Sequence, residues 1–111
     1  MAKVRTRAAV VHEPGGLFIF EDVEIDTPRP DEVVVRIVAC GVCHTDIAAR
    51  DGFFSMRFPT VFGHEGAGIV ETVGTDVTRV RAGDRVVLSF SSCGKCGNWQ
   101  RWPSGSLRGI R

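Results

Sequence analysis

The chain has 111 residues, of which 43% are hydrophobic and 24% charged, a composition typical of a single compact globular domain. Its 14 basic and 13 acidic residues give a net charge of +1, which provides no field to attract nucleic acid or an anionic membrane. The sequence contains no apolar stretch as long as a membrane-spanning helix and no signal-peptide pattern at its N-terminus. We therefore expect a cytoplasmic protein without nucleic-acid or membrane partners.

Short runs rich in Val, Ile and Phe, separated by clusters of Gly, Pro and Asp, predict β-strands along most of the chain. In chain order these strands are expected at residues 6–11, 18–23, 33–40, 68–73 and 85–90. One short helix is expected at 45–50, opened by Thr45 as a good N-cap residue. The pattern predicts a mainly β, barrel-like fold with one or two short helices.

Four cysteines form two Cys-x-x-Cys pairs, Cys40 with Cys43 and Cys93 with Cys96. In a reducing compartment such pairs indicate metal or redox chemistry more readily than disulfides. Cys43 alone could be a buried structural cysteine, because free cysteines are among the most buried residues. His64 alone could be a core histidine, but the glycines around it allow close backbone approach, which favours a ligand.

Two segments carry a resemblance to a known family. They are Gly-Val-Cys-His-Thr-Asp at 41–46 and Gly-His-Glu-Gly-Ala-Gly at 63–68, the second followed by Gly74 and Val77. They resemble the zinc-dependent alcohol dehydrogenases of the medium-chain dehydrogenase/reductase superfamily, and within it the aryl-alcohol branch. The resemblance implies a GroES-like, partly open β-barrel catalytic domain over residues 1–98. In the family this domain is normally followed by a Rossmann domain, which the sequence lacks.

The resemblance also implies a catalytic zinc site. Cys43 and His64 would be two of its ligands, and the third would lie beyond the C-terminus, because catalytic zinc takes three protein ligands and keeps one position open. Asp46 would orient the histidine ligand, and Glu65 would lie behind the zinc and approach it transiently. Solvated surface carboxylates are the alternative interpretation of both acids.

Two residues next to Cys43 would serve the reaction itself. Thr45 would accept the proton of the alcohol while zinc lowers the alcohol's pKa, and His44 would contact the cofactor pyrophosphate. Many family members extend the proton relay with a histidine at the position of Ala48, so the relay beyond Thr45 differs here. The sequence also lacks a Gly-x-Gly-x-x-Gly turn, so NAD(P) is expected to bind only in a full-length enzyme.

The second cysteine pair departs from the family pattern. Cys93 and Cys96 match the first two ligands of a structural zinc site, whereas Trp99 and Leu107 stand at the third and fourth positions. Structural zinc sites are nearly always four-liganded, so we expect this remnant not to hold zinc. Residues 99–111 are basic, contain Gly and Ser and lack periodic apolar residues, which predicts a disordered tail and suggests a frameshifted or truncated coding sequence.

The resemblance thus implies the catalytic-domain fragment of an oxidoreductase that transfers hydride from a primary alcohol, aromatic in the aryl-alcohol branch, to NAD(P). The fragment alone is expected to be inactive and not to form the homo-oligomers of the family. The apolar stretch from Phe53 to Phe58 could line a substrate pocket or belong to the core.

Three other interpretations remain open. One is a non-enzymatic GroES-like scaffold. Another is a four-cysteine zinc module, although 49 residues separate the two pairs, against about 15 to 20 in zinc ribbons. A third is a redox pair of Cys40 and Cys43, although no βαβ pattern surrounds it.

Overall fold

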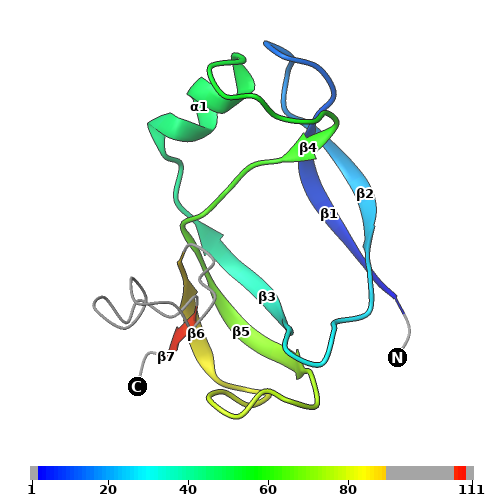
Figure 1. Ribbon diagram of the computed structural model, residues 1–111, viewed down its shortest axis with the longest axis vertical. Coiled ribbons are helices and arrows are strands. Elements are labelled where there is room, and N and C mark those ends of the chain that lie inside the picture. Colours follow the sequence, from blue (N-terminus) through cyan, green and yellow to red (C-terminus); the bar gives the residue numbers. More distant parts are fainter. Residues whose placement is uncertain (1–2, 90–106, 110–111) are drawn as a thin grey trace. The chain divides into compact units, whose positions relative to one another are not determined.

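The computed structural model describes residues 3–89 and 107–109 (Figure 1). The chain forms two compact units. The first consists of Met1–Thr27 and Val42–Gly63, and the second of Pro28–Gly41 and His64–Arg111. The described part of the chain contains no helix with the length and hydrophobicity that a membrane span requires.

The first unit contains a three-stranded antiparallel sheet and the helix. The sheet order is β2-β1-β4, with β1 at Val4–Val11, β2 at Ile19–Ile25 and β4 at Thr60–Val61. The helix α1 spans His44–Arg50. Val10 and Val11 are buried at the end of β1, and Ala49 is buried on α1, so the small core of this unit lies there.

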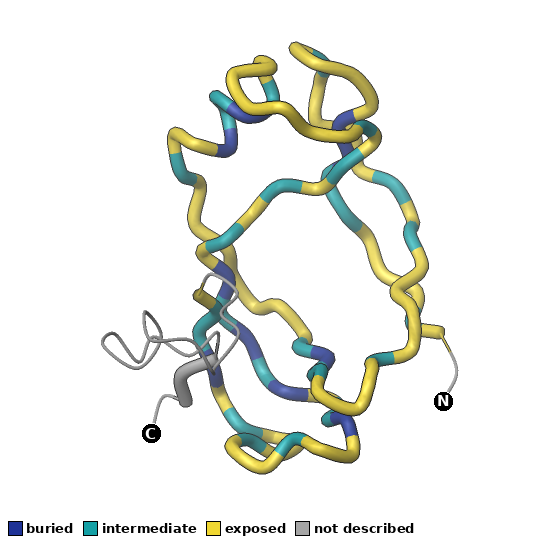
Figure 2. Tube along the Cα trace, viewed as in Figure 1, coloured by how far each residue is buried: buried dark blue, intermediate teal, exposed yellow. Residues whose placement is uncertain are grey.

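The second unit contains a four-stranded antiparallel sheet of order β3-β5-β6-β7. Its strands are β3 at Val33–Cys40, β5 at Gly66–Val73, β6 at Arg85–Leu88 and β7 at Leu107–Gly109. The core residues Val34, Val70 and Val86 come from three neighbouring strands and are buried (Figure 2). Strands β5 and β6 are the two inner strands of this sheet: β5 pairs with β3 and β6, and β6 pairs with β5 and β7.

Two glycines of the second unit lie where the backbone of another segment leaves no room for a side chain. A Cβ atom at Gly68 would lie 2.2 Å from the carbonyl oxygen of Arg36 on β3. At Gly74 it would lie 2.2 Å from the carbonyl oxygen of Pro30, and the Gly74 N–H donates to the Glu32 carbonyl at 2.7 Å. Heavy atoms cannot approach so closely, so β5 and the turn after it can pack as they do only with glycine at these positions.

The structure confirms the predicted mainly β fold, with all five predicted strands and one short helix. The helix begins one residue earlier than predicted, and its N-cap is Cys43 rather than Thr45. The physical reason is the Asp46 carboxylate, which accepts a hydrogen bond from the Cys43 N–H at 3.1 Å. Strand β4 escaped the sequence analysis because it has only two residues and follows a proline, so no alternation of apolar residues marks it.

Strand β7 lies within the tail for which the sequence predicts disorder. Its residues pair with β6, from Leu107 opposite Leu88 to Gly109 opposite Val86. The rest of the tail, which includes Trp99, lies outside the described residues. The same is true of Cys93 and Cys96. Residues 107–109 thus depart from the predicted disorder, whereas disorder of the rest of the tail and loss of the structural zinc site stay predictions.

Candidate metal centre

The end of β3 and the start of β5 lie side by side in one sheet. Cys40 pairs with Gly66, and the Gly41 N–H donates to the Glu65 carbonyl at 3.0 Å. A Cβ atom at position 41 would lie 3.2 Å from the Glu65 Cβ and 3.3 Å from its carboxylate Oε1, tighter than ordinary van der Waals contact. Glycine at position 41 therefore leaves the space in which the Glu65 carboxylate lies.

Cys43 stands at the start of α1, and its backbone is fixed by the first turn of the helix. The Asp46 carboxylate accepts the Cys43 N–H, and the Asp46 N–H donates to the Cys43 carbonyl at 3.0 Å. Asp46 is 9% exposed, and its negative charge near the helix N-terminus is favourable toward the helix dipole. Asp46 therefore holds the backbone that carries the Cys43 thiol, while its predicted contact with the histidine stays a prediction.

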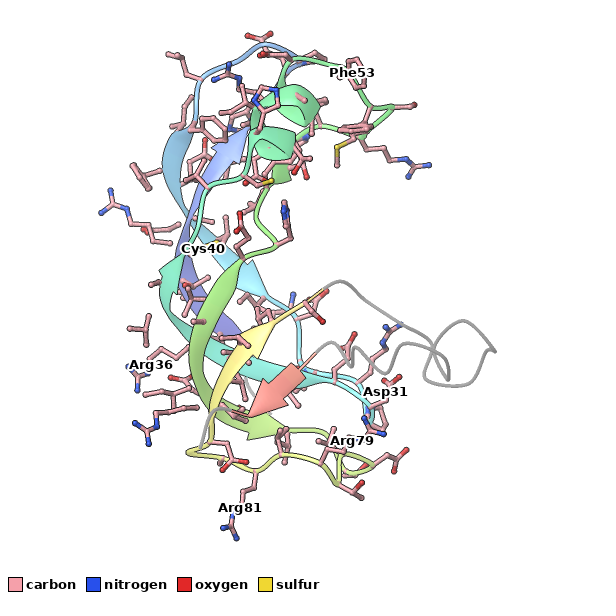
Figure 3. All side chains as sticks on the ribbon, turned by 90° about the vertical axis from the view of Figure 1, so that its left-hand side faces the viewer. Asp31, Arg36, Cys40, Phe53, Arg79 and Arg81 are labelled. Atoms are coloured by element: carbon pink, nitrogen blue, oxygen red, sulfur yellow. The ribbon has the colours of Figure 1, made fainter. Side chains whose placement is uncertain are left out.

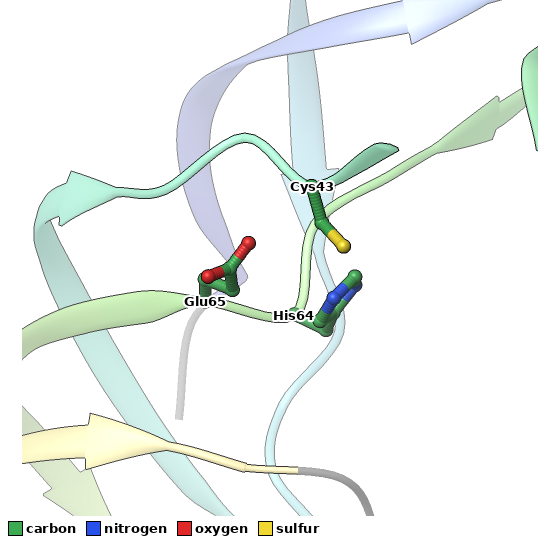
Figure 4. Close-up of side chains that lie close together, drawn as sticks. All are labelled: Cys43, His64 and Glu65. Atoms are coloured by element: carbon green, nitrogen blue, oxygen red, sulfur yellow. The ribbon is translucent and has the colours of Figure 1, made fainter. Parts of the chain in front are cut away.

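Cys43, His64 and Glu65 bring three potential metal donors together. Gly41 and Glu65 are joined by a backbone hydrogen bond. Cys43 follows Gly41 by two residues and His64 directly precedes Glu65, so both residues lie close in sequence to this hydrogen bond. Cys43 Sγ, a ring nitrogen of His64 and a carboxylate oxygen of Glu65 all lie within 4.8 Å of one another (Figure 4). Cys43 and His64 are half-buried and Glu65 is exposed.

The chemistry of this donor set fits zinc. Catalytic zinc sites use thiolate, imidazole and carboxylate ligands at about 2.0–2.3 Å, so two donors on one tetrahedral ion lie about 3.5 Å apart. The three donors here need only modest side-chain movement to reach that spacing. Magnesium and calcium prefer oxygen ligands, so a thiolate and an imidazole disfavour both ions.

The other predicted site residues occupy the surface beside Cys43. His44 and Thr45 form the first helical positions of α1, and both are exposed. Their predicted roles toward the cofactor and the alcohol proton stay predictions.

The apolar stretch after α1 is largely exposed. Phe53, Phe54 and Met56 are 81%, 46% and 43% exposed, and Figure 3 shows Phe53 at the surface. These three side chains are therefore not core residues of the first unit. Phe58 is half-buried and packs edge-on against Phe62.

Sequence reasoning gave no role to two features of this region. One is Gly41. The motif contains this glycine, but only the pairing of β3 with β5 shows that its missing side chain leaves space for Glu65. The other is the contact of Arg50 with Phe18, two residues far apart in sequence with no shared pattern to signal it.

Comparison with known proteins finds alcohol dehydrogenases both among sequence relatives and among solved structures. Residues 29–106 match the family model of the alcohol dehydrogenase GroES-like domain. Geraniol dehydrogenase from Castellaniella defragrans is 53% identical over 95 residues, which are 86% of this chain and 25% of the relative. The chain thus spans about a quarter of the length of this curated relative.

Two solved structures share the fold of the chain. An alcohol dehydrogenase zinc-binding domain protein from Burkholderia ambifaria superposes with a TM-score of 0.87 at 45% identity, over 90% of this chain and 27% of that one. Benzyl alcohol dehydrogenase from Acinetobacter calcoaceticus gives a TM-score of 0.84 at 43% identity, over 88% of this chain and 27% of that one. On the extent of these matches, the chain belongs to the alcohol dehydrogenase GroES-like domain family.

Proposed function

We propose that the chain binds one zinc ion through Cys43 and His64, with Glu65 as a third donor, and that it provides the metal-binding part of an NAD(P)-dependent alcohol dehydrogenase. The observation that carries this proposal is the set of three donor atoms within 4.8 Å of one another. Membership of the family supports it, since the similar solved proteins include a zinc-binding dehydrogenase domain.

In the proposed reaction a primary alcohol is oxidised to an aldehyde and its hydride passes to the nicotinamide ring of NAD(P). A zinc ion held by these residues would supply a Lewis acid that lowers the pKa of the alcohol. Thr45, exposed in the first turn of α1 two residues after Cys43, relays the proton that the alcohol loses: its hydroxyl takes that proton while giving up its own to solvent water. His44, the preceding exposed residue, contacts the cofactor pyrophosphate.

An aromatic or other bulky apolar alcohol suits the surface near this helix. Phe53, Phe54 and Met56 expose apolar side chains directly after α1, and binding sites for apolar ligands are lined by such groups. Similarity to a benzyl alcohol dehydrogenase supports the same substrate class.

Zinc content measured by elemental analysis, after dialysis against metal-free buffer, tests the metal site. We expect about one zinc per chain, because three donors from one site suffice to hold a catalytic-type ion. Cys43→Ser and His64→Ala should each remove the zinc, and Glu65→Gln should weaken its retention. Cys40→Ser is the matched control, since it removes a nearby exposed thiol and should leave the zinc in place.

Two outcomes would contradict the proposal. A chain without zinc would show that these residues do not form a working site. Zinc that survives His64→Ala but is lost on Cys40→Ser, or when Cys93 and Cys96 are replaced by Ser, would support the four-cysteine module instead. The inactivity expected of the chain alone is checked in the same preparation, by following NADH formation with benzyl alcohol and NAD.

A further inference from the structure

Three side chains from separate segments of the first unit stack on one another. The Arg50 guanidinium carbon lies 5.5 Å from the centre of the Phe18 ring, within the range of a cation–π contact. The Phe18 ring packs edge-on against Phe62, with ring centres 6.5 Å apart and planes at 77°. This stack of Arg50, Phe18 and Phe62 joins the end of α1, the segment before β2 and the segment after β4.

Arg50 is held by its backbone as well as by its side chain. Its carbonyl accepts a hydrogen bond from the Gly15 N–H at 2.7 Å, so the end of α1 is tied to the turn between β1 and β2. Its Nε donates to the Asp51 carboxylate at 2.9 Å, and the side chain is only 26% exposed. A half-buried guanidinium with these partners has little freedom to leave the Phe18 ring.

The helix needs such anchors because it is short. Its seven residues make about two turns, and isolated helices of this length are marginal in water. Only Asp46 and Ala49 are buried on it, so packing of an apolar face contributes little. Asp46 secures the start of α1 and Arg50 secures its end.

Both segments that carry the soft metal donors adjoin this stack. Cys43 is the N-cap of α1, so the thiol moves with the helix. Phe62 lies two residues before His64, so the edge-on contact restrains the segment that leads to the imidazole. We propose that Arg50 is a positioning residue for the zinc site, acting through Phe18 on both segments; this inference rests on the proposed function.

The consequence is a pre-organised site. Donors that must be ordered during binding lower the affinity, whereas donors already held near their bound geometry do not incur that cost. Removing the guanidinium or the ring should therefore weaken metal binding by about tenfold. Since Arg50 and Phe18 act through one contact, the double variant should bind hardly more weakly than either single variant.

The test is titration of the full chain with Co²⁺, read from the thiolate-to-cobalt absorption band and from competition with a chelator. Arg50→Ala and Phe18→Leu should each weaken Co²⁺ binding about tenfold, and Arg50→Lys, which keeps a cation near the ring, should restore part of the affinity. Arg5→Ala is the matched control in the same unit, because that side chain is 85% exposed and pairs with Glu24 at 3.5 Å. It should bind Co²⁺ like the unmodified chain.

Circular dichroism at the titration temperature separates positioning from folding. A folded Arg50→Ala variant with unchanged affinity and an unchanged cobalt spectrum would overturn the inference while leaving the proposed zinc site intact. If Arg50→Ala does not fold, Phe18→Leu decides in the same way, with Phe18→Trp as the ring-restoring variant. An unmodified chain that binds no Co²⁺ would overturn the proposed function together with the inference.

Discussion

The two units of the chain differ in how their apolar side chains are covered. In the second unit Val70 and Val86 are 1% exposed, and glycines allow direct backbone contact between neighbouring segments. The first unit instead leaves most of its large apolar side chains accessible in the described part of the chain. The exposed ones in the first unit are Leu17, Phe18, Ile19, Phe20, Ile25, Val42, Phe53, Phe54, Met56 and Val61, against Ile37 and Val38 in the second.

This difference concerns how each unit is stabilised. The second unit is stabilised by burial and by a register that tolerates almost no change at β5. The first unit carries Cys43, His44 and Thr45 on a short helix that depends on a cap and an aromatic contact. Accessible apolar surface next to reactive groups is typical of regions that receive a ligand or another chain segment.

The largest effect is expected from side chains introduced at the crowded glycines of the second unit. Gly68→Ala and Gly74→Ala place a Cβ against backbone oxygens and should each lower the free energy of unfolding by about 3 kcal/mol or more. Urea denaturation followed by circular dichroism measures this change. Gly83→Ala is the control, because nothing lies within 4 Å of its Cβ and only its φ of +96° opposes the substitution; it should cost about 1 kcal/mol.

A medium effect is expected at the buried valines, one in each unit. Val11 is 0% exposed and Val70 is 1% exposed. Val11→Ala and Val70→Ala should therefore each cost about 2 kcal/mol. Hydrogen exchange should accelerate mainly in β1 and β2 for the first variant, and in β3 and β5 for the second. Uniform acceleration of hydrogen exchange across the chain in either variant would show that the two units open together and not separately.

The smallest effect is expected on the exposed surface of the first unit. Phe53 is 81% exposed and contacts the Phe54 ring edge-on, with ring centres 5.3 Å apart. Phe53→Ser should change the free energy of unfolding by less than about 0.5 kcal/mol. It should raise the concentration at which the chain stays in solution, because an exposed apolar group is removed. A loss above about 1 kcal/mol would contradict the exposed position of this ring.

Much of the fold could be predicted because local pattern and tertiary structure agree. Val, Ile and Phe are frequent in five strands, β1, β2, β3, β5 and β6, and turn residues separate these strands. The predicted ends of each strand differ from the observed ends by two residues at most. The start of α1 was misplaced because a cysteine is a weak N-cap candidate by type, and only the contact from Asp46 makes it one.

The candidate metal site was only partly predictable. Cys43 and His64 stand in motifs and could be named from the sequence, and Glu65 was named as a carboxylate near the metal. That its oxygen lies within 4.8 Å of both other donors depends on the pairing of Gly41 with Glu65. Register of this kind is set by tertiary packing, so no local pattern reveals it.

The glycines of the second unit bear on how sequence signatures are interpreted. Gly68 and Gly74 belong to the segment by which the metal motif is recognised, yet each is required by a neighbouring carbonyl and not by a ligand. A descendant of this chain that lost Cys43 or His64 would still need both glycines in order to fold. A match carried mainly by glycines therefore indicates common ancestry of the architecture, and only the donor side chains themselves indicate a surviving metal site.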